Sequence, residues 1–186
     1  MSEVLSAILN RRSIRSFKQE QLKDSELNAI IEAGQFAPSA KNQQRWHFTV
    51  VQNKELLNEI NQVIQSIFLN SGVPELESRA KAENFSPFYH APTLIIVSVD
   101  EQAITPQSDG SLALGNILLA AHALHIGSVW VNSLRSLFDT EEGRALNDRL
   151  GIPAGYTIVG SAALGYNAGA HPAAAARREG TVTIIK

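Results

Sequence analysis

Thr93-Leu94-Ile95-Ile96-Val97-Ser98-Val99 is the stretch that decides the fold, because it is apolar almost without interruption. A short continuous apolar run rich in β-branched residues predicts a strand that is buried on both faces. Aromatic and β-branched residues also predict strands at Trp46–Val51 and Val129–Val131, and Tyr156–Leu164 is the last predicted core strand. We therefore expect a central sheet that includes residues 93–99.

Apolar residues at helical spacing predict helices before and after that strand. We expect Asp24 or Ser25 to cap the second helix and Gly34 to end or loosen it. The helix predicted at residues 112–124 is apolar almost all round, which indicates that it is buried, with Gly127 as its C-cap. The predicted helices are Val4–Leu9, Leu27–Ala33, Lys54–Leu69, Leu112–Leu124 and Thr140–Leu150.

Three further segments carry weaker signals. We expect residues 72–92 to be irregular or a broken helix, and the Ala/Gly/Pro/His stretch 167–176 to be a loose connection. Thr181–Ile185 at the end of the chain is β-prone. No internal repeat or linker divides the chain, so we interpret residues 1–186 as a single domain. The order of elements indicates an α/β or α+β protein with a central sheet.

Composition limits the possible chemistry. The net charge of −2 gives no reason to expect nucleic acid or an anionic membrane as partner. Cysteine is absent, which excludes disulfides, thiolate catalysis and cysteine-bound metal, so any redox chemistry must come from a bound cofactor. The first residues do not read as a signal peptide, and the apolar runs are shorter than the roughly 20 residues that span a bilayer. We expect a cytoplasmic protein.

A cationic segment near the N-terminus is the first candidate site. Arg11-Arg12-Ser13-Ile14-Arg15 contains the residue types that bind phosphate, because guanidinium groups pair with its oxygens and a hydroxyl adds a donor. A solvated basic face is the alternative interpretation. Arg177 and Arg178 form a second basic pair, which could clamp the same phosphate if the ends of the chain meet in the fold.

A polar loop and two histidines are the other candidates. Ser39, Lys41 and Asn42, followed by two glutamines, offer the hydroxyl and amide groups that hold the pyrimidine edge of a flavin, although an ordinary surface turn is the alternative. His122 and His125 lie three residues apart on a predicted helix, close enough to share a metal. No carboxylate spacing completes such a site, so we interpret them as a core histidine and a helix-terminal histidine.

Taken in order, several segments resemble the nitroreductase family. Arg11–Phe17 resembles its arginine-serine-arginine phosphate motif. Ala37–Phe48 resembles its second motif, in which proline-serine and then asparagine precede an aromatic strand. Weaker similarities in the same order are Phe88–Val99, Leu112–Ala121, Gly151–Pro153, Gly165–Tyr166 and the terminal arginines.

The resemblance implies a fold, a cofactor and a reaction. The fold would be α+β, with three α/β/α layers, a mostly antiparallel central sheet flanked by helices, and an intertwined homodimer with FMN at the subunit interface. Reducing equivalents would pass from NAD(P)H through flavin N5 to a nitroaromatic, quinone or similar small acceptor. The resemblance implies no catalytic side chain and no metal.

The resemblance also assigns the contacts to FMN. Arg11, Ser13 and Arg15 would hold the phosphate and ribityl end, with Arg12 beside them. The other expected contacts are Pro38, Ser39, Ala40 and Asn42 from the partner subunit, Val131, Asn132 and Ser133 near the reactive nitrogen, and Arg177 or Arg178 at the phosphate.

Departures from the family pattern keep other functions open. Arg45 stands where many relatives have proline, and Asn132-Ser133 stands where better-known members have glutamate and glycine. The chain is also short for the family, which leaves the acceptor open. One alternative is a specialised flavoenzyme of the same fold, such as a reductive dehalogenase or a flavin-consuming enzyme. Another is a non-catalytic protein that binds or stores FMN.

Overall fold

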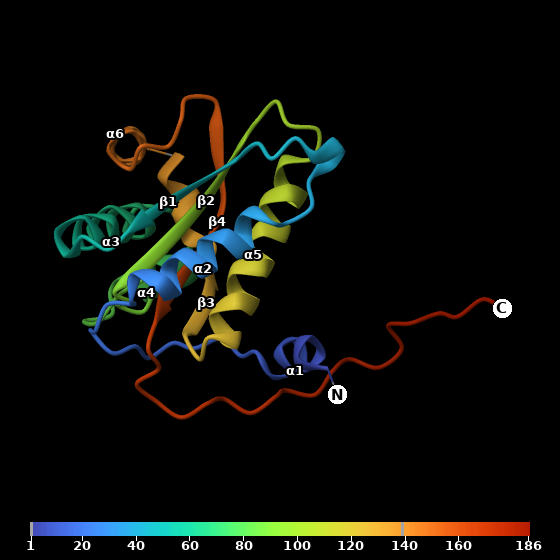
Figure 1. The fold of residues 1–186 in the computed structure, drawn as a ribbon. Coiled ribbons are helices and arrows are strands. Elements are labelled where there is room, and N and C mark those ends of the chain that lie inside the picture. Colours follow the sequence, from blue (N-terminus) through green and yellow to red (C-terminus); the bar gives the residue numbers. More distant parts are fainter. Residues whose placement is uncertain (1, 139) are drawn as a thin grey trace.

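A four-stranded antiparallel sheet forms the centre of the computed structural model, which describes residues 2–138 and 140–186. The strand order is β1-β2-β4-β3 (Figure 1). Thr93–Val99 is buried along its whole length in a central strand, which confirms the prediction from its apolar sequence. The strands are β1 (Trp46–Val51), β2 (Thr93–Asp100), β3 (Gly127–Val131) and β4 (Tyr156–Gly165).

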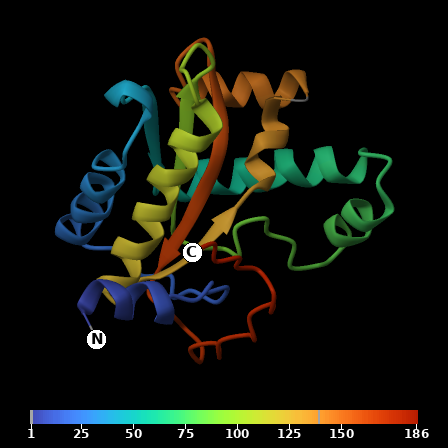
Figure 2. The same cartoon turned by 90° about the vertical axis from the view of Figure 1, so that its right-hand side faces the viewer.

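Helices cover the two faces of this sheet (Figures 1 and 2). The predicted helix at Lys54–Leu69 is confirmed at both ends, and the broken helix expected within residues 72–92 is a short helix followed by turns. The helices are α1 (Glu3–Asn10), α2 (Asp24–Gln35), α3 (Lys54–Leu69), α4 (Pro74–Ala80), α5 (Pro106–Ala123) and α6 (Glu141–Arg149), with 3-10 turns η1 (Ala40–Asn42) and η2 (Ser133–Phe138).

Alternation along β2 divides the core into two layers. Leu94 and Ile96 face α3 and α6, whereas Ile95 and Val97 face α2 and α5. Successive side chains of a strand point to opposite faces, so an unbroken apolar run is what a sheet covered on both sides requires. The three-layer α/β/α arrangement and the antiparallel central sheet confirm the expected α+β fold.

Gly34 has a different role from the one predicted. It lies in the last turn of α2, which ends one residue later, and it is buried against α5. A Cβ at this position would lie 2.9 Å from Cγ1 of Ile117. The absence of a side chain therefore lets α2 and α5 approach closely, and Asn116 Nδ2 donates a hydrogen bond of 2.9 Å to Ala33 O across the same contact.

Two predicted helix caps and one helix start are wrong. Lys23, rather than Asp24 or Ser25, precedes α2, and its N–H donates to Glu26 Oε2 at 3.0 Å. The buried helix begins at Pro106 instead of residue 112, because proline suits the first turn and the polar residues after it hide the helical pattern. His125, rather than Gly127, adopts the left-handed conformation after α5, with a φ of 60°. Gly127 is instead the first residue of β3.

The C-terminal segment leaves the body of the protein. It passes near α1 and then extends outward, so that the end of the chain lies away from the sheet (Figure 1). Thr181–Ile185 forms no strand with the rest of the described chain, and Val182, Ile184 and Ile185 are 77%, 75% and 94% exposed. Residues 167–176 are irregular, as expected. Among the described residues, no helix combines the length and the hydropathy needed to cross a membrane.

Candidate functional site

The N-terminal arginines lie along the outer edge of β3. Ile14 N–H donates to Ser128 O at 3.0 Å, and Ser13 forms a parallel bridge with the same strand residue. Ile14 is buried and lines a small pocket together with Arg12. Arg11, Ser13 and Arg15 are not part of the lining of that pocket.

Positive charge accumulates at this end of the sheet without acidic partners. The pKa of Arg11 is lowered by burial and by the nearby guanidinium groups of Arg12 and Arg177. Arg177 is therefore close to the N-terminal arginines, so the two ends of the chain do meet; Arg178 is exposed. No salt bridge within the described part of the chain involves these arginines. Such a cluster suits a phosphate dianion, which supplies the missing negative charge.

Arg12 and Arg15 have partners that the sequence did not reveal. Arg12 Nη1 donates to Leu9 O and to its neighbour's carbonyl, both at 2.8 Å, and so caps the end of α1. Arg15 Nε donates to the Tyr89 hydroxyl at 3.3 Å, and its guanidinium group lies 5.7 Å from the centroid of that ring. The tyrosine therefore holds Arg15 at the edge of the cluster.

The predicted ring contacts after β3 lie at the other end of the same strand. Four residues separate Ser128 from Asn132, which corresponds to about 13 Å of extended strand. Val131 is buried and its carbonyl accepts a bond of 3.1 Å from Ser161 Oγ, whereas Asn132 is exposed and Ser133 begins η2. The outer edge of β3 thus leads from the arginines to Asn132.

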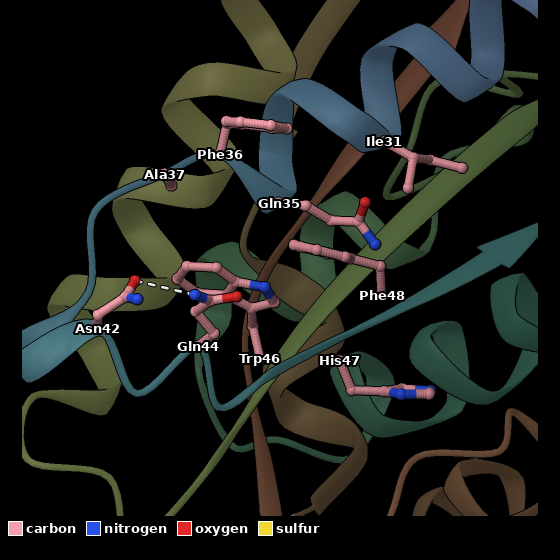
Figure 3. Close-up of a pocket in the computed structure, with 9 residues that line it drawn as sticks. All are labelled: Ile31, Gln35, Phe36, Ala37, Asn42, Gln44, Trp46, His47 and Phe48. Carbon is pink, nitrogen blue, oxygen red and sulfur yellow. Dashed lines mark hydrogen bonds between the residues drawn. The ribbon is translucent and has the colours of Figure 1, made fainter.

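The polar loop has a strained backbone. Lys41, Asn42 and Gln44 have φ values of 49°, 54° and 51°, a region that residues other than glycine seldom occupy. Ser39 Oγ accepts a bond of 3.0 Å from Gln44 N–H, and Asn42 Oδ1 accepts one of 2.9 Å from Gln44 Nε2 (Figure 3). These bonds hold the loop in one conformation, with Pro38 exposed at its start.

A buried carboxylate joins this loop to the first turn of α5. Asp109 is 2% exposed, and its Oδ1 accepts hydrogen bonds from Ala40 N–H at 3.2 Å and from Thr105 Oγ1 at 2.9 Å. Gln43 Oε1 accepts a further bond of 3.0 Å from Ile104 N–H. The loop is therefore attached to the start of α5. Asp109 was not predicted as a site residue, because its neighbours in the sequence are small and polar.

A broad aromatic hollow opens beside the loop, between the end of α2 and β1 (Figure 3). Its volume is about 880 Å³. Trp46 and Phe48 lie on the same face of β1 with ring centroids 6.2 Å apart, and Phe36 is 79% exposed at the rim. Asn42 and Gln44 supply amide groups at the other side. Such a lining suits a flat aromatic molecule.

Arg45 and Asp100 explain one departure from the family pattern. Arg45 Nη1 forms a salt bridge of 3.1 Å with Asp100 Oδ2, and Asp100 N–H donates to Arg45 O at 3.0 Å. The charged residue thus fastens the start of β1 to the end of β2, whereas a proline could accept the backbone bond but could not form the salt bridge.

The predicted site residues form two groups that do not meet within one chain. Ala40 is bonded to Asp109 in the first turn of α5, whereas Arg11 and Arg12 lie near His122 in its last turn. The 13 residues between positions 109 and 122 correspond to about 20 Å of helix. The arginines with the edge of β3 form one group, and the loop with the aromatic hollow forms the other. Figure 1 shows α1 and the loop around η1 near opposite ends of α5.

The fold is of the three-layer α+β class, and comparison with known proteins identifies its family. The sequence profile of the Nitroreductase family matches residues 8–166, and the chain belongs to this family. An Archaeoglobus fulgidus protein, named for NADH dehydrogenase and NAD(P)H nitroreductase activity, is 33% identical over 172 residues, covering 89% of this chain and 86% of its own.

Two solved structures match the whole chain. A nitroreductase with bound FMN from Bacteroides fragilis is 40% identical, with a TM-score of 0.95 and 100% of each chain covered. A nitroreductase with bound FMN from Desulfitobacterium hafniense is 30% identical, with a TM-score of 0.88 and again 100% of each chain covered. The fold expected from the sequence motifs is therefore confirmed.

Proposed function

We propose that this protein is an FMN-dependent oxidoreductase that takes reducing equivalents from NAD(P)H and passes them to a small acceptor such as a nitroaromatic compound or a quinone. Its family and its similarity to FMN-bound nitroreductases support this function. The observation that carries it is the convergence of Arg11, Arg12 and Arg177 at one end of the outer edge of β3, with no salt bridge to a carboxylate among the described residues.

The residues present fit an FMN molecule. Arg11, Ser13 and Arg15 would bind the phosphate, with Arg12 beside them and Arg177 closing the site, because the guanidinium groups of Arg11, Arg15 and Arg177 can neutralise a dianion. The path of about 13 Å along β3 then leads to Asn132 and Ser133, whose backbone would face the ring. FMN, when bound, supplies the redox chemistry, since none of these side chains can accept a hydride.

We further propose that the site is completed by a second copy of the chain. Exposed apolar side chains support this interface: α1 presents Val4, Leu5, Ile8 and Leu9, which are 50–68% exposed, and α5 presents Leu112 and Leu124, which are 47% and 38% exposed. A two-fold axis that pairs α5 with its copy in antiparallel orientation brings the first turn of one helix to the last turn of the other.

This arrangement joins the two groups of site residues. The loop Pro38–Asn42 of one protomer would then cover the flavin ring held by the arginines of its partner, and the aromatic hollow would border the same ring. In this position the loop would exclude water from the ring and would place amide donors against it. The apolar end of the chain, Val182–Ile185, would lie against the partner, which makes the dimer intertwined.

An absorbance spectrum of the purified protein tests the proposed function. We expect a flavin band that bleaches under anaerobic conditions on addition of NADH or NADPH, and that returns when a nitroaromatic compound or a quinone is added. A protein that binds no flavin even after incubation with FMN would contradict the proposal. Bound flavin that neither nicotinamide donor reduces would instead favour the storage function, and reduction without turnover of generic acceptors would favour a specialised flavoenzyme.

The dimer has a separate test. We expect light scattering coupled to size exclusion to give twice the mass of 20.2 kDa. Deletion of residues 181–186 is expected to weaken association, because it removes the exposed apolar end of the chain. A monomer that retains FMN would contradict a site shared between protomers.

A further inference from the structure

A second cationic pocket lies behind the arginine segment. Its volume is about 140 Å³, and it is lined by Arg12, Ile14, His122, His125, Ile126, Gly127, Asn167 and His171. Three imidazoles and a guanidinium group therefore meet there, and the lining contains no carboxylate. Arg11, Ser13 and Arg15 do not line this pocket. It therefore lies beside the proposed phosphate site of FMN and shares only Arg12 with it.

The position of His122 differs from the core position expected from the sequence. Its ring is partly exposed in the last turn of α5 and lies 6.0 Å from the ring of His171, centroid to centroid. His171 comes from the irregular segment after β4, and its Nε2 donates to Asn10 O at 3.1 Å, since a carbonyl can only accept. The pocket thus joins α5, the end of α1 and the C-terminal segment.

Unsatisfied donors and mutual repulsion mark this pocket as a site for an anion. Arg12 Nε is buried without a hydrogen-bond partner, although Nη1 of the same group is fully engaged with carbonyls. Burial is the main cause that lowers the pKa of His122, and the charges of His171, Arg11, His125 and Arg12 lower it further. Arg177 lies near Arg11 and adds a further positive charge beside this pocket. A bound anion would accept a hydrogen bond from the unpaired donor and would offset the repulsion between the positive charges.

We propose that this pocket binds a free tetrahedral oxyanion, inorganic phosphate or sulfate, between Arg12, His122 and His171. The size agrees, because 140 Å³ corresponds to about five water volumes in the liquid, which holds such an ion but not a nucleotide. The bound ion would tie the C-terminal segment that carries His171 to the ends of α1 and α5. The assignment does not depend on the redox activity of the protein. The described residues contain no group of three ligands that would favour a metal here.

Binding of sulfate to the FMN-saturated protein tests the proposal, because FMN then occupies the other anion site. Sulfate keeps its charge throughout, so any pH dependence belongs to the protein. His122 gains a proton as pH falls, and the pocket becomes more cationic, so sulfate should bind more tightly at pH 6 than at pH 8. If one proton is taken up on binding, the sulfate affinity changes by up to about tenfold per pH unit. We expect calorimetry to show sulfate binding that chloride at equal ionic strength does not reproduce.

His122→Asn and His171→Asn are each expected to weaken sulfate binding at pH 6 at least fivefold, and His122→Asn also to reduce its pH dependence, while FMN content stays unchanged. His90→Asn is the matched control, because His90 lies elsewhere and its φ of 52° suits asparagine. Equal affinity in all three variants would overturn the assignment, as would the absence of any sulfate-specific binding. Displacement of sulfate by 2′-AMP would also overturn it, because the pocket would then be a phosphate-monoester subsite rather than a free-ion site.

Discussion

Replacement of Asp109 by alanine should loosen the loop that carries Ser39 and Asn42. The change leaves Ala40 N–H and the Thr105 hydroxyl without their common acceptor. Hydrogen bonds to a charged group contribute about 1.5–3 kcal/mol each, but Asp109 Oδ2 is buried without a partner, and removal of that oxygen offsets part of the loss. We expect a net destabilisation of about 2 kcal/mol, which lowers Tm by about 4–8 °C in a protein of this size.

Two assays separate the global effect from the local one. Thermal unfolding at fixed protein and FMN concentrations measures stability, since bound cofactor and subunit association both shift Tm. The rate of cleavage by trypsin at Lys41 measures how readily the loop opens, because Lys41 is exposed within the loop and cleavage requires local opening. The alanine variant should be cut at Lys41 faster than the unaltered protein.

Asp109→Asn is the matched control. Asparagine keeps an oxygen acceptor at the same position and removes only the charge, so Ala40 and Thr105 retain their partner. This variant should stay within about 1 kcal/mol of the unaltered protein. If the alanine variant unfolds at the original Tm with unchanged cleavage, or if both variants behave alike, the carboxylate oxygen does not hold the loop and the reasoning is refuted.

Three other substitutions test further contacts. Arg15→Ala should weaken FMN retention by removing a charged phosphate contact, and dialysis followed by flavin absorbance checks this; full retention would contradict the assignment. Gly127→Ala should cost about 1–3 kcal/mol in urea unfolding because of overpacking, since its Cβ would lie 2.9 Å from both the carbonyl oxygen of Gly165 and a methyl carbon of Ile14; an unchanged urea midpoint would contradict this overpacking. Tyr166→Phe should destabilise at pH 7, because the Tyr166 hydroxyl bond lowers the pKa of Glu26 below 4.5, and the deficit should shrink as pH falls through the lowered value. A deficit that persists in acid would exclude this linkage.

Strong periodic patterns account for the part of the fold that the sequence predicts. Residues 93–99 and Lys54–Leu69 are long and uniformly apolar or amphipathic, and both occur as expected. The predicted start of α5 was wrong for a physical reason. Pro106 and the polar residues after it form a helical turn that the loop covers, so tertiary contacts stabilise a turn whose sequence pattern is weak. The positive φ at His125 is likewise set by tertiary contacts, because glycine is the residue that most readily adopts this conformation.

The candidate site was predictable where charge or motif marked it. Arginines close in sequence are visible as a cluster, and their meeting with Arg177 only required the chain ends to converge. Asp109 and Tyr89 were not predictable, because each acts through one contact to a residue about 70 positions away. The small pocket behind the arginines was hidden for the same reason, since His171 and His122 come together only through the path of the irregular C-terminal segment.

The placement of the two groups at opposite ends of α5 has a genetic consequence. In the proposed dimer every cofactor site draws on both polypeptides, so an alteration in the arginine segment and one in the loop damage different halves of it. Two inactive alleles, one of each kind, would then produce mixed dimers in which one site collects both defects and the other collects none. Co-expression should recover activity in mixed dimers alone, with half of the sites functional, and the two ends of a single helix would define two complementation groups within one gene.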